Sequence, residues 1–367
     1  MSFSPDQISI LCVYSALAVY AIAFIAYSID LAKRGVAAGA AANAADEVDA
    51  DATAAPVAVG MLQAAASAQV AAARAGAASA SPYGPTGEAS DAAAPRRSRW
   101  RSALEAGASV EYGRSPALRV AVAMTVLAWA LHLTADVLRG VAAGRVPWAN
   151  MYEFALTGTL VVTTVYLVVL LFAKQDLRFL GTFVTGLVLV LLGVAAVNFY
   201  VEVAPLPPAL QSVWLVIHVF VATSSVGFFA LGFALSAVQL MQARRESLVA
   251  SAEAITKSFL ATLPNSVSLE NLAYRVNIIG FILWTFTLMA GAIWAEKAWG
   301  RYWGWDTKEV WTFIIWVIYA GYIHARATRG WRGSRSAWLA IIGFSAVLFN
   351  FTIVNLFFKG LHAYSGL

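Results

Sequence analysis

Residues 178–198 read RFLGTFVTGLVLVLLGVAAVN, a stretch in which Arg178 is the single charged side chain. A helix needs about 20 predominantly apolar residues to cross a hydrocarbon core of roughly 30 Å. Similar stretches recur along the whole chain. We therefore predict an all-α fold, a polytopic integral membrane bundle of about eight transmembrane helices, near residues 8–31, 117–138, 153–173, 178–198, 213–238, 273–294, 308–326 and 337–357.

The composition agrees with a membrane protein. Of 367 residues, 60% are hydrophobic and 12% are charged, whereas a soluble domain carries roughly twice that charged fraction. The formal charge of +5 does not indicate nucleic acid, because the basic residues lie between the apolar stretches, where they set topology. Cys12 is the only cysteine and lies in the first apolar stretch. Any thiol–disulfide chemistry must therefore belong to a partner.

Three regions of the sequence differ in character. Residues 1–34 form the first transmembrane helix. Residues 35–115 are rich in Ala, Gly and Ser and poor in aromatics, so they cannot bury enough apolar surface to offset the entropy of ordering. We expect this low-complexity segment to be a cytoplasmic loop that is disordered or loosely helical. Residues 116–367 form the main membrane domain.

The distribution of basic residues predicts the orientation. Nineteen of the 25 Lys and Arg residues fall on one set of loops, and six fall on the other. The six are Arg139, Arg145, Lys297, Arg301, Lys308 and Lys359. The richer side is predicted to be cytoplasmic. Both termini then lie outside the cell (plasma) membrane, and the active face is extracytoplasmic.

A cluster of aromatic residues lies on the predicted outer side, in and around Trp299-Gly-Arg-Tyr-Trp-Gly-Trp-Asp306. Two histidines flank it: His218 lies roughly 7 Å inside the outer end of its helix, and His362 lies just beyond the last helix. Two imidazoles beside aromatic rings suit a planar iron porphyrin. The alternative is an interfacial belt of Trp and Tyr. We predict haem b, with His218 and His362 on the iron and a platform of Trp294, Trp299, Tyr302, Trp303, Trp305 and Asp306.

The other two histidines are predicted to have separate roles. His324 lies roughly 27 Å along the helix from Asp306, so it cannot share an iron with His218 or His362. A second haem in the membrane would use such a ligand; the alternative is a histidine at the cytoplasmic headgroups beside Arg326. His132 is expected to support the structure rather than bind iron.

Charged residues near the platform suggest two further roles, contact with the haem propionates and capping of a helix. Haem propionates favour Arg or Lys partners, and Arg301 lies inside the aromatic segment, with Lys297 and Lys308 on either side. The alternative is a cation that extends its head to the membrane interface. Asp306 begins a predicted helix, where a carboxylate can cap free amides, so its direct role at haem is a weaker expectation.

At these residues the sequence resembles the CcsA family, also called ResC and sometimes labelled CcsB in bacteria, of system II for cytochrome c maturation. The resemblance covers about residues 117–367, and its WWD motif lies in a loop at 294–307. The matching stretches are Arg145–Glu153, Leu210–His218, Tyr274–Phe281, Gly291–Trp311, Tyr322–Arg326 and Asn355–Tyr364. Ala363 departs mildly from the serine expected there.

The resemblance implies roles by position. It makes His218 and His362 external haem ligands, and His324 a membrane ligand whose partner imidazole comes from a ResB-like (CcsB-like) membrane protein. It implies transport of haem to the outer face and thioether attachment to the CxxCH motif of apocytochrome c, as part of a holocytochrome c synthase. One alternative is a haem exporter or chaperone that forms no bond. Another is a haem electron carrier, which the single inner histidine argues against.

Overall fold

The structure, a computed structural model, describes residues 4–74, 115–173, 175–251, 258–328, 331–358 and 360–362. These residues form helices and connecting segments and include no strand. The long helices are α1 (Pro5–Arg74), α3 (Pro116–Ala143), α4 (Met151–Phe172), α5 (Gly181–Asn198), α6 (Val213–Ala250), α7 (Ser266–Trp299), α8 (Thr307–Ala327) and α9 (Ser334–Phe351). Short elements are η1 (Arg178–Leu180), η2 (Pro208–Leu210), η3 (Phe259–Thr262) and α10 (Ile353–Phe357).

The prediction of an all-α, polytopic bundle is confirmed. Each predicted span overlaps one of the long helices, although the 178–198 span begins in η1 and the 337–357 span continues past α9 into α10. Seven helices in the described part of the chain are long and apolar enough to cross a membrane. The remaining one, α8, is less apolar because it carries Lys308, Glu309 and several Trp and Tyr side chains. The side on which each terminus lies stays a prediction.

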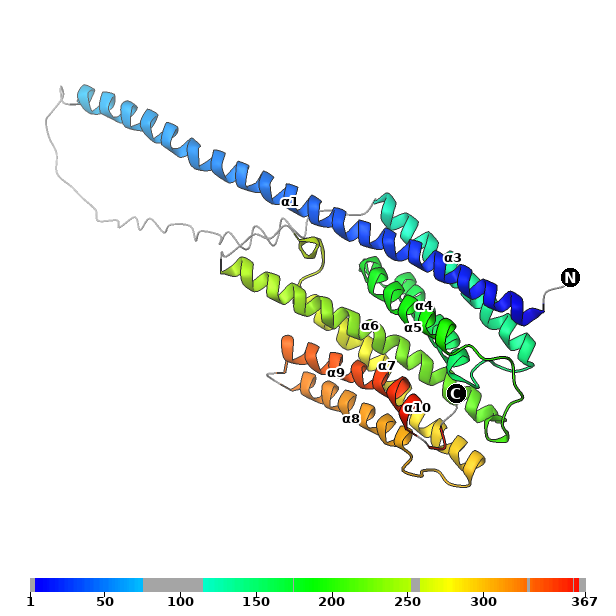
Figure 1. The fold of residues 1–367 in the computed structure, drawn as a ribbon. Helices are drawn as coiled ribbons and strands as arrows, with labels where there is room; N and C mark the ends of the chain where they lie inside the picture. Colours follow the sequence, from blue (N-terminus) through cyan, green and yellow to red (C-terminus); the bar gives the residue numbers. More distant parts are fainter. Residues whose placement is uncertain are drawn as a thin grey trace. The chain divides into compact units, whose positions relative to one another are not determined.

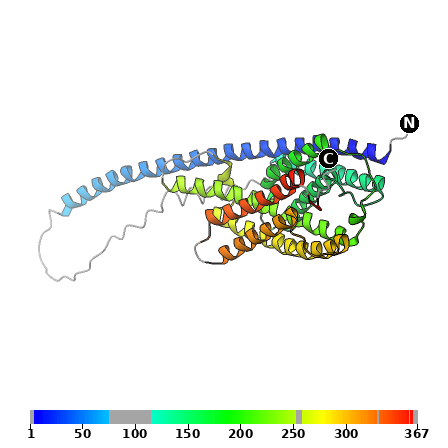
Figure 2. The same cartoon turned by 60° about the horizontal axis from the view of Figure 1, so that its bottom comes forward.

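The chain divides into two compact units. Unit 1 comprises Met1–Ala32, Gly113–Ser247 and Pro264–Leu367. Unit 2 comprises Lys33–Tyr112 and Leu248–Leu263 and contains η3. Every candidate site residue belongs to unit 1, in which the long helices run alongside one another (Figures 1 and 2).

The Ala-rich region begins inside α1, which continues as helix to Arg74. Alanine has the highest helix propensity, which accounts for this continuation past the predicted span. Residues 75–114 lie outside the described residues. The expectation of a cytoplasmic low-complexity segment over 35–115 therefore stays a prediction.

Local sequence sets the ends of the helices that frame the site. Ser115 caps α3, with Pro116 in the first turn, and Gly144 ends it in the left-handed conformation. Gly300 ends α7 with φ of 69°. Glycine adopts this conformation without a steric penalty. The chain therefore turns sharply between α7 and α8, which places the Trp-rich segment in a connection between two long helices.

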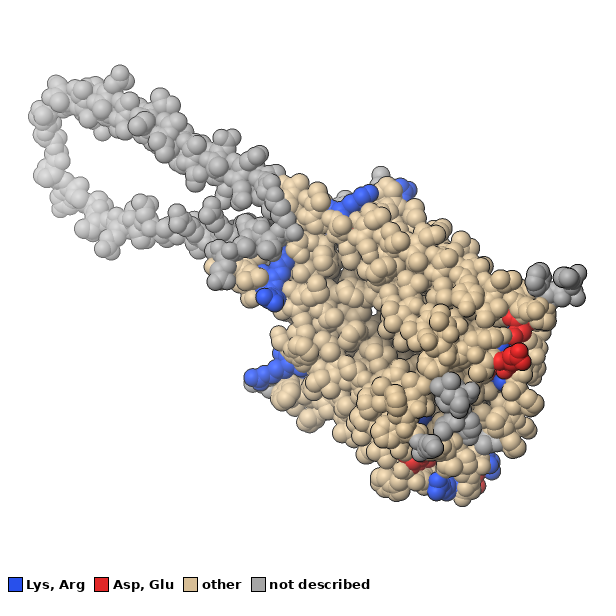
Figure 3. All heavy atoms as spheres, in the orientation of Figure 1, with Lys and Arg blue, Asp and Glu red and all other residues tan. Residues whose placement is uncertain are grey.

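Buried polar contacts tie the helices of unit 1 together. Ser9 on α1 donates to the carbonyl of Ala135 on α3 at 2.7 Å, and Ser225 on α6 donates to the carbonyl of Gly280 on α7 at 2.6 Å. Small and hydroxyl residues let helix backbones approach closely in a membrane, where helix association depends on packing and hydrogen bonds. On the face drawn in Figure 3, charged side chains gather toward the helix ends, with an uncharged band between them.

An ion-pair network lies where α1, α3 and α4 meet. The Arg139 side chain is fully buried and pairs with Asp6 at 2.7 Å and with Glu153 at 3.0 Å. Arg145 contacts the other Glu153 oxygen at 2.7 Å. The Arg139 guanidinium also lies 5.3 Å from the centre of the Tyr152 ring. These contacts fix the turn before α4, which belongs to the Arg145–Glu153 motif.

Candidate functional site

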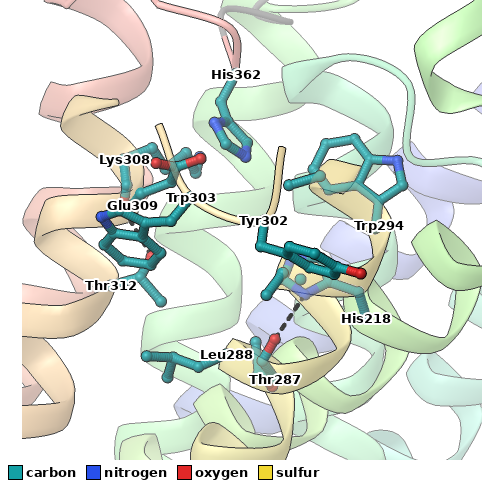
Figure 4. Close-up of a pocket in the computed structure, with 13 residues that line it drawn as sticks. His218, Thr287, Leu288, Trp294, Tyr302, Trp303, Lys308, Glu309, Thr312 and His362 are labelled. Carbon is teal, nitrogen blue, oxygen red and sulfur yellow. Dashed lines mark hydrogen bonds between the residues drawn. The ribbon is translucent and has the colours of Figure 1, made fainter. Parts of the chain in front are cut away.

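One pocket gathers five of the ten predicted site residues. It contains about 480 Å³ of space outside the atoms, part of it open to solvent. α6, α7, the first turns of α8, the 300–306 connection and the 360–362 segment all contribute to its wall. The predicted residues that line it are His218, Trp294, Tyr302, Trp303 and His362. In Figure 4, Lys308 and Trp303 lie across the pocket from Trp294 and His218.

His218 is held by a backbone group of α7. Its Nδ1 lies 3.0 Å from the carbonyl oxygen of Thr287 (dashed in Figure 4). Because a carbonyl only accepts, Nδ1 carries the proton and Nε2 keeps its lone pair. Gly291 makes room for the ring, since a Cβ there would lie 2.8 Å from His218 Cε1 and 2.9 Å from Nδ1. The imidazole is thus in the tautomer that binds metals through Nε2.

His362 is held in the same tautomer by a carboxylate. Its Nδ1 lies 2.7 Å from Oδ2 of Asp306. The hydrogen bond from His362 is the main cause that lowers the pKa of Asp306, and backbone amides of Leu361 and Lys308 add to it. A Cβ at Gly360 would overlap the Asp306 carboxylate, so a glycine is needed for this close approach. Histidine ligands of metals commonly donate to a carboxylate in this way.

Aromatic rings connect the two histidines. His218 stacks on Trp294 with ring centres 5.8 Å apart and planes at 19°. His362 meets Trp294 edge-on at 5.4 Å and Trp299 at 4.8 Å. Trp294 is 2% exposed. The two imidazoles therefore share one buried indole as a neighbour, and the apolar wall restricts how far either ring can rotate.

The 300–306 connection is fixed by Glu309 of α8. One Glu309 carboxylate oxygen accepts from the amides of Gly304 at 2.8 Å and Asp306 at 3.1 Å. Asp306 is the N-cap of α8, as predicted. Trp305 has φ of 57°, which is costly for a bulky residue and persists only when neighbouring contacts hold it. Its side chain is 77% exposed and meets Trp303 edge-on.

The three cations of the segment lie in different surroundings, and which of them contacts haem stays a prediction. The exposed Arg301 side chain lies over Gly304 and is outside the pocket lining. Lys308 lines the pocket and donates to the amide oxygen of Asn355. Lys297 pairs with Glu296 at 3.2 Å. The directions of these side chains depend on how α8 begins, which the sequence alone does not give.

The other two histidines lie away from the pocket. His324 is exposed near the far end of α8 from Asp306. His132 is fully buried, with Nε2 2.9 Å from the carbonyl of Leu156 and Nδ1 3.3 Å from the hydroxyl of Tyr20. Both His132 ring nitrogens therefore have partners, which agrees with a structural role.

Several contributors to the site have no distinctive sequence signal. Thr287 acts through its backbone, and Asn355 is one of several amides in the chain. Gly291 and Gly360 matter because they lack a side chain. Glu309, three residues after Asp306, is the exception, because this spacing is that of a helix capping box.

Comparisons with known proteins show the family of this chain. The family model described as cytochrome C assembly protein matches residues 148–362. The cytochrome c biogenesis protein CcsA of Prochlorococcus marinus is 35% identical over 277 residues, which cover 69% of this chain and 85% of that protein. The CcsA protein of Guillardia theta is 36% identical over 244 residues, which cover 62% of this chain and 80% of that protein. This chain is a multi-pass membrane protein with a role in cytochrome c biogenesis, and it belongs to the CcsA/ResC family.

Proposed function

We propose that the pocket binds haem b through Nε2 of His218 and Nε2 of His362 and presents it for attachment to apocytochrome c. The observation that supports this proposal is that the two imidazoles are hydrogen-bonded in the same way, each through Nδ1. Each donates its Nδ1 proton to a fixed oxygen, on Thr287 or on Asp306. A neutral imidazole held in this way has its lone pair on Nε2, the atom that binds haem iron when Nδ1 is occupied. Two such rings against one pocket suit a six-coordinate haem.

The remaining parts of the site suit a flat, largely apolar guest. Trp294, Trp299 and Trp303 supply aromatic surface, and Tyr302 and Trp305 are exposed beside them, where a polypeptide substrate could approach. Haem supplies the two vinyl groups, across which the thiols of a CxxCH segment add to form thioethers. The chain contributes orientation and exclusion of water, and the reaction needs no side-chain nucleophile from it.

Replacement of each histidine tests the proposal. His218→Ala and His362→Ala should each lower haem retained by the purified full-length protein at least about tenfold and lower cytochrome c yield, with partial rescue by added imidazole. Phe220→Ala is the control, because Phe220 lies on the same helix and is 58% exposed. If both histidine variants keep the parent haem spectrum and yield without imidazole, the proposed ligation is wrong.

We also propose that His324 serves a second haem site with a ResB-like membrane protein. His324 is exposed on α8, so a partner helix could supply a second imidazole to an iron there. Haem should be counted in the full chain purified with and without the partner. The proposal predicts additional haem only in the complex, and its loss in His324→Ala. Equal haem in both preparations would contradict it.

Attachment by this chain, as distinct from delivery alone, is a separate part of the proposal. The full chain and its partner should be reconstituted with reduced haem and an apocytochrome peptide that carries CxxCH. Formation of thioether-linked haem supports a synthase, in which a thioredoxin-like protein keeps the peptide thiols reduced. Tight haem binding without any linked product would instead support a haem exporter or chaperone.

The proposed topology places the pocket outside the plasma membrane. It rests on the distribution of Lys and Arg, which puts six of 25 on the side of the pocket. A reporter that is active only outside the cytoplasm should be active when it is fused at either terminus. A reporter that is active only in the cytoplasm should be active when it is inserted within residues 75–112, as expected for the low-complexity segment. The reverse pattern would overturn the orientation.

A further inference from the structure

Three of the six cations on the predicted outer side have a carboxylate partner. Arg139 and Arg145 share Glu153, and Arg139 also pairs with Asp6. Lys297 pairs with Glu296. Lys359 lies outside the described residues. Two cations, Arg301 and Lys308, make no ion pair within the part of the chain that the structure describes, and only Lys308 lines the pocket.

Lys308 is in an unfavourable position for a structural lysine. It occupies the first turn of α8, where the helix dipole places partial positive charge and favours acidic side chains. Its ammonium is part-buried, and the partner that holds it is the neutral amide oxygen of Asn355. A part-buried cation with a neutral partner gains most from an anion in the same space.

The Asn355 amide is oriented so that its oxygen faces Lys308. Its Nδ2 donates to the carbonyl of Phe351 at 2.8 Å and lies 3.7 Å from the sulfur of Met151. Because the carbonyl only accepts, the NH₂ group must face Phe351. Oδ1 is then directed to Lys308, and the ammonium is held at the pocket rather than released into solvent.

The two carboxylates beside Lys308 are engaged elsewhere. Asp306 accepts from His362, and Glu309 accepts from the amides of Gly304 and Asp306. Moving either carboxylate to Lys308 would break the contacts that fix the loop and the imidazole. Asp306 attracts the Lys308 ammonium through space but makes no ion pair with it, so the charge of Lys308 is available to a guest of the pocket.

We propose that Lys308, and not Arg301, is the residue of this pocket that binds a propionate of haem, with Asn355 holding its ammonium in place. This inference rests on the proposed function, because it takes haem as the guest. It adds a determinant of specificity: the pocket distinguishes a porphyrin with free carboxylates from one whose carboxylates are esterified. Lys308 is a binding residue here, and the attachment chemistry does not require it.

The test compares haem with haem dimethyl ester, which lacks the propionate charges. Dissociation constants are measured by absorbance titration of the full-length protein in detergent. The parent protein is expected to bind haem at least about tenfold more tightly than the ester. Lys308→Gln and Lys308→Met should bind both compounds with the affinity of the ester. Lys308→Arg should retain most of the preference.

Lys297→Gln is the matched control, since Lys297 is 61% exposed and pairs outside the pocket. Lys297→Gln should keep the parent ratio of the two dissociation constants, for haem and for its dimethyl ester. Arg301→Gln should keep this ratio as well. A parent protein that binds both compounds equally, or a Lys308→Gln protein that keeps the parent ratio, overturns the inference. Loss of the ratio in Arg301→Gln alone would transfer the role to Arg301 and overturn it too.

The outcome for Lys308 is separable from the outcome for the histidines. If the two-imidazole haem spectrum forms in the parent protein but the ratio is unaffected by Lys308, this inference fails and the proposed function stands. If the spectrum is absent from the parent protein, or unaffected in both histidine variants, the proposed function fails. Lys308→Met guards against a folding defect, because it conserves length and suits an apolar environment.

Discussion

His362 Nδ1 lies 2.7 Å from Oδ2 of Asp306, although 56 residues separate them in the chain. The contact joins the C-terminal segment to the first turn of α8 and completes the pocket wall. It also makes the two proposed haem ligands unequal. His362 donates to a carboxylate, whereas His218 donates to the neutral carbonyl of Thr287. A charged acceptor raises the basicity of its imidazole more than a neutral one does.

Asp306→Asn should weaken this contact while keeping the shape of the side chain. Haem affinity is expected to fall about 10- to 100-fold, as for other partners of metal-bound histidines. The reduction potential of bound haem should rise, because His362 becomes a weaker electron donor. Spectroelectrochemical titration measures the potential. An unchanged potential in Asp306→Asn, with normal folding, would show that the carboxylate does not act through His362.

Gly291→Ala should displace His218 without removing it. The added Cβ would lie within 2.9 Å of two ring atoms, so the imidazole must move and its contact with Thr287 weakens. We expect about tenfold weaker haem binding with an altered spectrum. Gly158→Ala is the matched control, because a Cβ at Gly158 meets no atom within 4 Å. Equal haem binding in the two variants would contradict the assigned role of Gly291.

Glu309→Ala should release the connection before α8. Two backbone amides lose their acceptor, which costs about 1–3 kcal/mol for a buried polar group. The strained Trp305 backbone can then relax, so haem binding is expected to fall with the stability of the loop. Thermal unfolding and haem titration measure the two effects. Glu296→Gln, which alters an exposed pair, should change neither; a comparable loss there would argue against a specific role for Glu309.

Arg139→Met should destabilise the fold more than any surface ion pair. It leaves the carboxylates of Asp6 and Glu153 without their shared partner, and the Glu153 side chain is fully buried. Breaking a buried pair costs about 3–5 kcal/mol. Arg178→Ala removes an exposed pair with Asp176 and should cost about 1 kcal/mol or less. Thermal unfolding in detergent compares them, and equal effects would contradict the buried-network interpretation.

The sequence was sufficient for the helices and insufficient for the contacts between them. Apolar runs identified all the long helices, since length and hydropathy are local properties. The end of α1 was not identified, because Ala-rich sequence favours helix without any packing partner. Arg301 was preferred over Lys308 as a haem contact because it lies within the aromatic motif. The structure shows that Lys308 lines the pocket and Arg301 does not, and this difference in side-chain direction depends on the helix start at Asp306.

The sequence by itself determined that this chain is a membrane helix bundle with two histidines beside a tryptophan-rich connection. Membrane insertion is governed by the hydropathy of contiguous residues, which the sequence states directly. Only the tertiary structure decided that Asp306 meets His362, that Thr287 meets His218 and that Lys308 faces the pocket. These contacts join residues distant along the chain, and they follow from helix packing and from backbone atoms and glycines that carry no sequence signal of their own.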